Sequence, residues 1–186
     1  MSVNKHLPHV LVLPEDDANR QLANGFLLQV DPARLRRMQV LPVAGGWHEV
    51  LELFLADHVN EMDLYASRFM ILLIDFDSDD ERMENATNRI PARLRHRVFI
   101  LGARPEPEDL TRAGLGSPEA IGSAMAQDCR DQTETIWGHE LLRHNAGELA
   151  RLRGQVIMAY PIEQAIHIIG GTDVEENPRN NRMRAR

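Results

Sequence analysis

Acidic side chains follow three apolar runs of this sequence, each at the point where the run ends. They are Glu15 after residues 9–13, Asp75 and Asp77 after residues 69–74, and Glu106 and Glu108 after residues 97–101. Carboxylates that gather in one place raise one another's pKa, so a fold that brings them together commonly binds a cation there. Hard oxygen ligands select Mg²⁺, Mn²⁺ or Ca²⁺ over zinc. The pattern therefore predicts a site for Mg²⁺ or Mn²⁺.

The elements that must position these acids alternate between strands and helices. Aliphatic and β-branched runs predict buried strands, and apolar residues at helical spacing predict helices between them. The expected strands cover residues 9–13, 38–43, 69–74 and 97–101, with helices over 16–29, 47–55 and a polar segment that ends near 94. This order predicts an α/β, Rossmann-like fold, with a mostly parallel sheet of about four to five strands and helices on both faces. Ligands bind such folds outside the carboxyl ends of the strands, where the acids stand.

The second half of the chain is expected to be mainly helical. Ser117 and Pro118 predict a helix start, because serine caps a helix and proline suits its first position. A longer helix is expected over residues 133–152, and residues 156–160 are the candidate fifth strand. Residues 175–186 have almost no apolar content and are predicted to be disordered. We expect one α/β domain over residues 1–174, with its helical C-terminal part from about 115.

Some of the acids have a simpler interpretation, because carboxylates after a strand often cap the next helix or form solvated surface. We favour that interpretation for Asp16, Asp17, Asp79 and Asp80. Asp75 and Asp77 flank Phe76 at the end of the most apolar run, so an extended segment there would place both carboxylates on one side. We therefore interpret these two residues and Glu15 as functional.

Composition narrows the class of protein. The formal net charge is −7 at pH 7, which argues against a protein that coats nucleic acid through bulk electrostatics. The single cysteine, Cys129, cannot pair within the chain, so no disulfide framework is expected, and a reducing cytoplasm is the expected location. The longest apolar run, residues 69–74, is far shorter than the roughly 20 residues that span a bilayer.

The strand-end residues resemble the Toprim domain of topoisomerases, DnaG-type primases and OLD-family nucleases. The resemblance covers residues 9–112 and rests on Glu15, Gly45-Gly46, Asp75-x-Asp77 and Glu106-x-Glu108. It implies that Glu15 does general acid/base work and that Asp75 and Asp77 hold Mg²⁺. It also implies that Glu106 and Glu108 help to bind a second metal.

A second resemblance is to response-regulator receiver domains. Residues 9–17 look like their first strand and acidic pair, and residues 69–75 look like the strand that presents their phospho-accepting aspartate. Receivers use a lysine after the fifth strand, whereas Tyr160 stands at the comparable position here and Lys5 is the only lysine. This resemblance therefore leaves open a degenerate receiver domain that is used for contacts with other proteins.

The leading hypothesis is metal-dependent phosphodiester chemistry on nucleic acid. Arg20, Arg82 and Arg104 are candidate contacts to phosphates, since binding nucleic acid needs cations somewhere on an acidic surface. No Gly-Lys-Ser/Thr phosphate loop is present, so any energy from nucleotides must come from a partner such as an ATPase, which the Toprim resemblance also implies. The alternative is a non-catalytic signalling or scaffold module on a receiver-like or degenerate Toprim fold.

Overall fold

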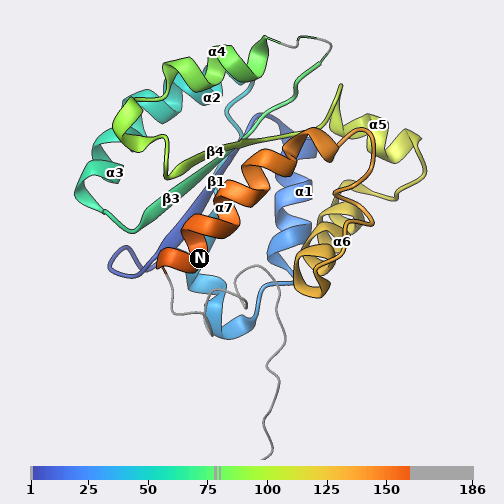
Figure 1. The fold of residues 1–186 in the computed structure, drawn as a ribbon, viewed down its shortest axis with the longest axis horizontal. Coiled ribbons are helices and arrows are strands. Elements are labelled where there is room, and N and C mark those ends of the chain that lie inside the picture. Colours follow the sequence, from blue (N-terminus) through green and yellow to red (C-terminus); the bar gives the residue numbers. More distant parts are fainter. Residues whose placement is uncertain (1, 78, 80, 160–186) are drawn as a thin grey trace, which may run out of the picture.

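The strands of the protein form one parallel sheet (Figure 1), in a computed structural model that describes residues 2–77, 79 and 81–159. The strands are β1 (His9–Pro14), β2 (Met38–Val40), β3 (Arg68–Leu73) and β4 (Val98–Leu101). Their order across the four-stranded sheet is β2-β1-β3-β4, and every neighbouring pair is parallel. The α/β class and the four predicted strands are therefore confirmed.

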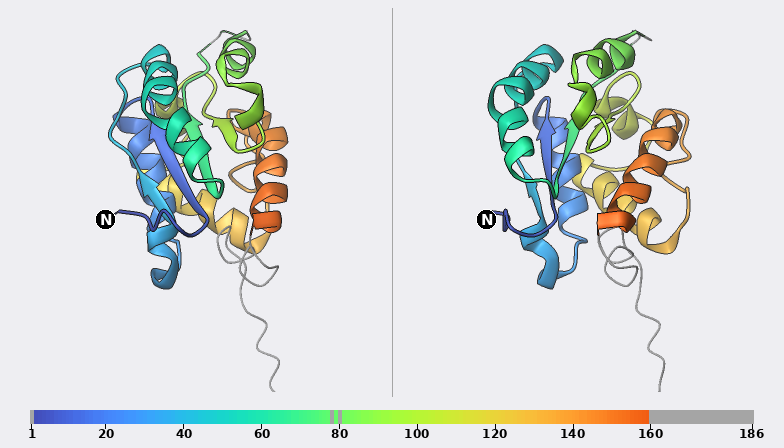
Figure 2. Two further views of the ribbon diagram at one scale, coloured as in Figure 1. Left: turned by 90° about the vertical axis from the view of Figure 1, so that its left-hand side faces the viewer. Right: turned by 60° about the vertical axis from the view of Figure 1, so that its left-hand side comes forward.

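Helices cover both faces of the sheet, and Figure 2 shows the sheet between the two helical layers. One layer holds α2 (Trp47–Leu53), a π-helical turn (Phe54–His58), α3 (Val59–Leu64) and α4 (Arg82–Arg89). The other holds α1 (Asp17–Leu27), α5 (Pro107–Arg112), α6 (Pro118–Asp131) and α7 (Ala146–Ala159). Short 3₁₀ helices lie at Pro32–Arg37, Ala92–Leu94 and Arg143–Asn145. Among the described residues, none of the helices has the length and apolarity needed to cross a membrane.

The core consists of two layers, because successive strand residues point to opposite faces of a sheet. Leu11 and Leu72 pack in the layer of α2, α3 and α4, whereas Val12 and Ile71 pack in the layer of α1 and α7. All four side chains are buried. Burial on both faces explains why the strands read as continuous apolar runs.

Hydrogen bonds with Asn145, the residue just before α7, hold the carboxyl end of β4 in place. The Asn145 side chain accepts a hydrogen bond from the Gly102 N–H at 3.1 Å and donates one to the Gly102 carbonyl at 2.8 Å. A Cβ atom at Gly102 would lie 1.6 Å from the carbonyl oxygen of Ile74, so only glycine fits beside the neighbouring chain. This packing fixes the path of the chain from β4 to α5.

The predicted helix over residues 133–152 is wrong in its first half, which forms turns. The reason is Asp128, a buried carboxylate that accepts hydrogen bonds from the Thr133 hydroxyl at 2.6 Å and from the Trp137 N–H at 3.1 Å. These bonds hold the segment after α6 in turns, and α7 begins only at Ala146.

The predicted fifth strand is also wrong over residues 156–159, which continue α7. A short apolar run suits a buried helix as well as a strand, so periodicity alone did not distinguish them. Tyr160, which the receiver comparison used, lies outside the described residues. The segment predicted to be disordered, 175–186, also lies outside them.

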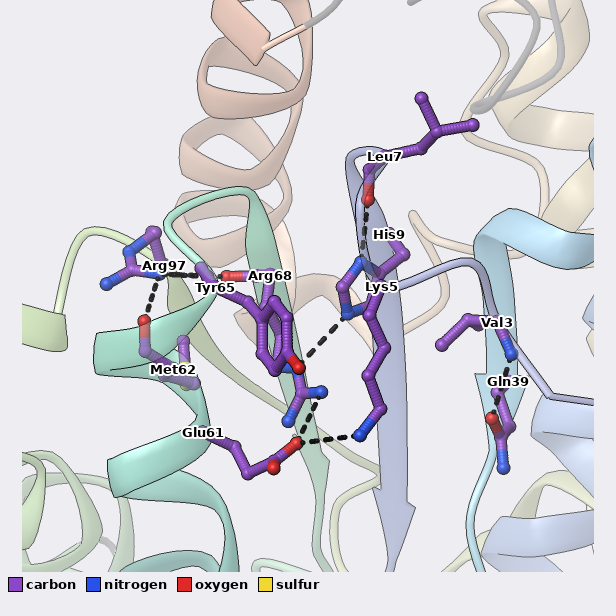
Figure 3. Close-up of polar contacts among 10 residues, drawn as sticks. All are labelled: Val3, Lys5, Leu7, His9, Gln39, Glu61, Met62, Tyr65, Arg68 and Arg97. Atoms are coloured by element: carbon purple, nitrogen blue, oxygen red, sulfur yellow. Dashed lines mark hydrogen bonds and ion pairs between the residues drawn. The ribbon is translucent and has the colours of Figure 1, made fainter.

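A polar network joins the amino ends of β1 and β3 (Figure 3). His9 is fully buried, and its Nε2 accepts a hydrogen bond from Arg68 Nε at 3.1 Å. Arg68 also forms an ion pair of 2.8 Å with Glu61, which pairs in turn with Lys5 at 3.3 Å. The network therefore ties β1, β3, α3 and the N-terminal segment together at the end of the sheet opposite to the predicted site.

Candidate functional site

The candidate site lies outside the carboxyl ends of β1 and β3, which are neighbours in the sheet. The chain leaves β1 for β2 on one side of it, whereas β3 and β4 lie on the other side. The sheet edge where β1 and β3 end is therefore a topological switch point, the usual ligand position in an open α/β sheet. Glu15 directly follows β1, and Asp75 follows β3 by two residues.

Backbone hydrogen bonds hold Glu15 in place. Its N–H donates to the Leu73 carbonyl at 2.9 Å, and its carbonyl accepts from the Gly45 N–H at 2.8 Å. Its Oε2 accepts from the Asp75 N–H at 2.8 Å. Burial raises the pKa of the Glu15 carboxyl above its usual value, although the bond from Asp75 acts against this rise. Glu15 is therefore a rigid carboxylate whose proton affinity is higher than that of a surface glutamate.

Asp75 is the most perturbed acid of the site. It is 8% exposed, and burial raises its pKa to about 7, helped by the negative charges of Glu15, Asp16 and Glu108. One hydrogen bond acts in the other direction, because Asn19 Nδ2 donates to Asp75 Oδ1 at 2.8 Å. Within the described residues, Asp75 forms no ion pair. Its ionised form is therefore poorly compensated, which is the condition in which a carboxylate gains most from a bound cation.

Asn19 is a member of the site that the sequence analysis missed. Its side chain is fully buried on α1, and its Nδ2 donates to Asp16 Oδ1 at 3.1 Å as well as to Asp75. The Asn19 Oδ1 is buried without a hydrogen-bond partner in the part of the chain that the structure describes. Asp16 caps α1 by accepting from the Asn19 N–H at 2.9 Å, which confirms its predicted capping role. Asn19 stands three residues after the N-cap Asp16, and this position in the first turn of α1 is the signal that could have located it.

The structure does not place Asp77 on an extended segment with Asp75, contrary to the sequence prediction. β3 ends at Leu73, and Asp77 has a φ of 47°, in the left-handed region. The chain therefore turns at Asp77 and does not continue extended from Asp75. Asp77 Oδ2 accepts a hydrogen bond from Arg82 Nη2, while Arg82 Nη1 donates to the Asp75 carbonyl. Asp77 still lies close enough to Glu15 for its charge to raise the pKa of Glu15.

Of the acids after β4, Glu108 is near enough for its charge to act on Asp75, whereas Glu106 pairs with Arg112. Glu108 lies in the first turn of α5, and its charge contributes to the raised pKa of Asp75. Glu106 lies at the N-cap of α5, with Arg112 Nη1 4.0 Å from its carboxylate. The structure thus brings Glu15, Asp75, Asp77 and Glu108 into one electrostatic site.

The three candidate arginines differ in their surroundings. Arg82 is 9% exposed and pairs with Asp77, so its two Nη atoms already have partners. Arg20 is exposed and pairs with Asp17 on α1. The guanidinium of Arg104 lies over the ring of Phe76, 5.8 Å from its centroid. Arg82 therefore positions the Asp75–Asp77 segment, and the phosphate contacts of all three stay predictions.

The donor set fits a hard divalent cation by its chemistry, since it consists of carboxylates, and burial together with neighbouring negative charges raises the pKa of Asp75. The buried, unpartnered Asn19 Oδ1 adds one neutral oxygen close by. Among the described residues, no three His, Cys, Asp or Glu side chains stand in a metal-binding arrangement. Ser78 and Asp80 of the same loop lie outside those residues.

No family model, curated protein or solved structure matches this chain. The Toprim and receiver resemblances therefore stay predictions. The functional argument rests on the position and charge of the residues described above.

Proposed function

We propose that the protein carries out metal-dependent phosphodiester chemistry on nucleic acid at the site of Glu15, Asp75, Asp77 and Glu108. The observation that carries this proposal is the buried carboxyl of Asp75, whose pKa is raised to about 7 by burial first and then by the charges of Glu15, Asp16 and Glu108. Strongly perturbed acids at a switch point are more typical of functional sites than of helix caps.

Each residue has a distinct role in this proposal. Asp75, Asp77 and Glu108 hold Mg²⁺ or Mn²⁺, which when bound stabilises negative charge at phosphorus. Glu15 accepts a proton from the attacking water molecule, because its raised pKa brings its basicity closer to neutral pH. Arg82 is a positioning residue, since it fixes Asp77 and the Asp75 carbonyl.

A second candidate is a non-catalytic signalling or scaffold module. The observation that favours it is the strand order β2-β1-β3-β4, which begins the flavodoxin-like order of receiver domains. The only lysine, Lys5, pairs with Glu61 at the opposite end of the sheet, so it does not serve a phosphorylated aspartate at the switch point. This candidate therefore concerns protein contacts rather than phosphoryl transfer.

The test combines metal binding with hydrolysis. Mn²⁺ is titrated calorimetrically into the wild type, into the double variant Asp75→Asn/Asp77→Asn, and into Asp131→Asn, which removes an exposed carboxylate from the end of α6. The same samples are assayed on bis(p-nitrophenyl) phosphate and on plasmid DNA. We expect binding and hydrolysis in the wild type and in Asp131→Asn, and loss of both in the double variant.

Two outcomes would go against the enzyme. A wild type that binds no Mn²⁺ at millimolar concentration overturns the metal site and leaves the scaffold candidate. A double variant that still hydrolyses the phosphodiester as fast as the wild type overturns the assignment of these residues.

A further inference from the structure

We propose that the site acts on single-stranded nucleic acid and holds an unpaired base on the aromatic pair of Trp47 and His48. This inference rests on the proposed function, because it names the substrate class of the same site. The inference goes beyond the proposed function because nothing in the acidic residues distinguishes an unpaired strand from a duplex.

The aromatic pair is tied to the acidic site through the loop after β2. The Ala44 N–H donates to the Pro14 carbonyl at 3.0 Å, and the Gly45 N–H donates to the Glu15 carbonyl at 2.8 Å. Trp47, two residues later, is the first residue of α2. The loop therefore delivers the aromatic pair to the same edge of the sheet as Glu15.

A second link runs through Arg82. Its guanidinium lies over the ring of Trp47, with 5.1 Å between the guanidinium carbon and the ring centroid. The same guanidinium holds Asp77 through Nη2. Trp47 and the carboxylate of Asp77 thus both contact the buried side chain of Arg82, which holds them near each other.

The two rings pack against each other at a tilt, with 3.7 Å between their centroids and 32° between their planes. Trp47 is half-buried against the core of α2 and contacts both Arg82 and His48, whereas His48 is exposed. A base would therefore stack on the exposed imidazole of His48, which the ring of Trp47 supports from behind.

Stacking suits this chain because it does not depend on positive charge. Most affinity for nucleic acid usually comes from lysine and arginine at the phosphates, but this chain has a net charge of −7 and pairs Arg20 and Arg82 with acids. Aromatic side chains stack on any base that is unpaired, whereas a duplex hides the faces of its bases. The expected preference is for a single strand, with a shallow dependence on salt concentration.

The test measures binding of short labelled oligonucleotides by fluorescence anisotropy, both in EDTA and with Mn²⁺ and a phosphorothioate backbone. Single-stranded DNA, single-stranded RNA, a duplex and a strand without bases are compared on the wild type. The variants are Trp47→Leu, which keeps an apolar side chain against the core, and His48→Ala, with His96→Ala as the matched exposed histidine at the other end of the sheet.

We expect the wild type and His96→Ala to prefer the single strands to the duplex. Trp47→Leu and His48→Ala should weaken single-strand binding about tenfold and bind the duplex no worse. The strand without bases should bind the wild type as weakly as the intact strand binds Trp47→Leu. In Trp137→Phe, Trp47 is the only tryptophan left, and single strands should quench its fluorescence.

Equal affinity of the wild type for the single strand and the duplex overturns the inference, as does no single-strand binding in either buffer. So does equal binding of intact and base-free strands. If the wild type binds Mn²⁺ and hydrolyses bis(p-nitrophenyl) phosphate but gives one of these results, only the stacking proposal is refuted. Absence of both metal binding and hydrolysis refutes the proposed function instead.

Discussion

At the amino ends of β1 and β3 each buried polar side chain meets a partner of complementary charge or character, whereas at the carboxyl ends of the same strands the buried carboxyl of Asp75 has, within the described part of the chain, only one side-chain hydrogen bond, from Asn19, and lies near other carboxylates. Figure 3 shows the first arrangement, with Arg68 between His9 and Glu61. At the second, Asp75 is within reach of the charges of Glu15, Asp16 and Glu108. Both regions lie on the same two strands, so the difference comes from the side chains.

This difference indicates that the amino ends of β1 and β3, rather than their carboxyl ends, are arranged for stability. The His9 Nδ1–H donates to the Leu7 carbonyl at 2.7 Å, so both ring nitrogens of this buried histidine have partners. At the carboxyl end, Asn19 Oδ1 and Arg82 Nε are buried without partners among the described residues. Buried polar atoms without partners are costly and tend to persist at functional sites. Four predictions test this comparison.

The largest expected effect is on catalysis. Glu15→Gln keeps an oxygen for the Asp75 N–H but removes the base, so the hydrolysis rate should fall by roughly a thousandfold. Steady-state rates on bis(p-nitrophenyl) phosphate measure this, with calorimetry to show that Mn²⁺ binding is retained. An unchanged rate would remove Glu15 from the mechanism.

The second prediction concerns the stability cost of Asp75. Its pKa of about 7 in the fold exceeds the ordinary value of 3.8, so the folded protein loses stability as pH rises from about 4 to about 7. Asp75→Asn cannot ionise and should be more stable than the wild type by roughly 4 kcal/mol at pH 8 and equally stable at pH 4.

Urea denaturation at the two pH values, without metal, measures this gap. Asp131→Asn is the matched control and should change little at either pH. A variant that is less stable than the wild type at pH 8 would show that the carboxylates at this end stabilise the fold.

The third prediction breaks the amino-end network. Arg68→Met leaves the buried Nε2 of His9 without a donor, which should destabilise the fold by roughly 2 kcal/mol. Arg93→Met removes an exposed arginine that pairs with Asp63 and should have little effect. Equal effects of the two variants in urea denaturation would mean that the buried network is no more stabilising than a surface ion pair.

The smallest effect is a dependence on pH at the amino end. Burial lowers the pKa of His9 below its ordinary value of 6.5, so the unfolded chain takes up more protons as pH falls below 6.5 and stability decreases there. The decrease ends once pH passes below the pKa of His9 in the fold. His9→Gln keeps an acceptor for Arg68 and should show a flatter decrease than the wild type between pH 7 and 5. Identical slopes in denaturation series would exclude His9 as the titrating group.

The sequence predicted the strands, and the position of the acids directly after them, because both depend on local composition. Apolar runs long enough for buried strands indicated β1, β3 and β4, and the acids directly after them lie at the edge where parallel strands end. The turn at Asp77 and the role of Asn19 were not predicted. Each depends on contacts between residues far apart in the chain, such as the bond from Asn19 to Asp75.

The C-terminal part was predicted less well for a similar reason. The turns over residues 133–142 depend on the buried carboxylate of Asp128, which takes hydrogen bonds that a helix would otherwise make. Residues 156–159 carry an apolar run that suits either secondary structure, and in the structure they continue the helix α7.

By itself, the sequence determined that this is an α/β protein with acids at the ends of its strands, because periodicity and composition act over a few residues. Only the tertiary structure decided which acids share one electric field and which pair with arginine. Glu108 raises the pKa of Asp75, whereas Glu106 pairs with Arg112, and Arg82 pairs with Asp77. The physical reason is that burial and charge act between side chains that the fold brings together, whatever their separation along the chain.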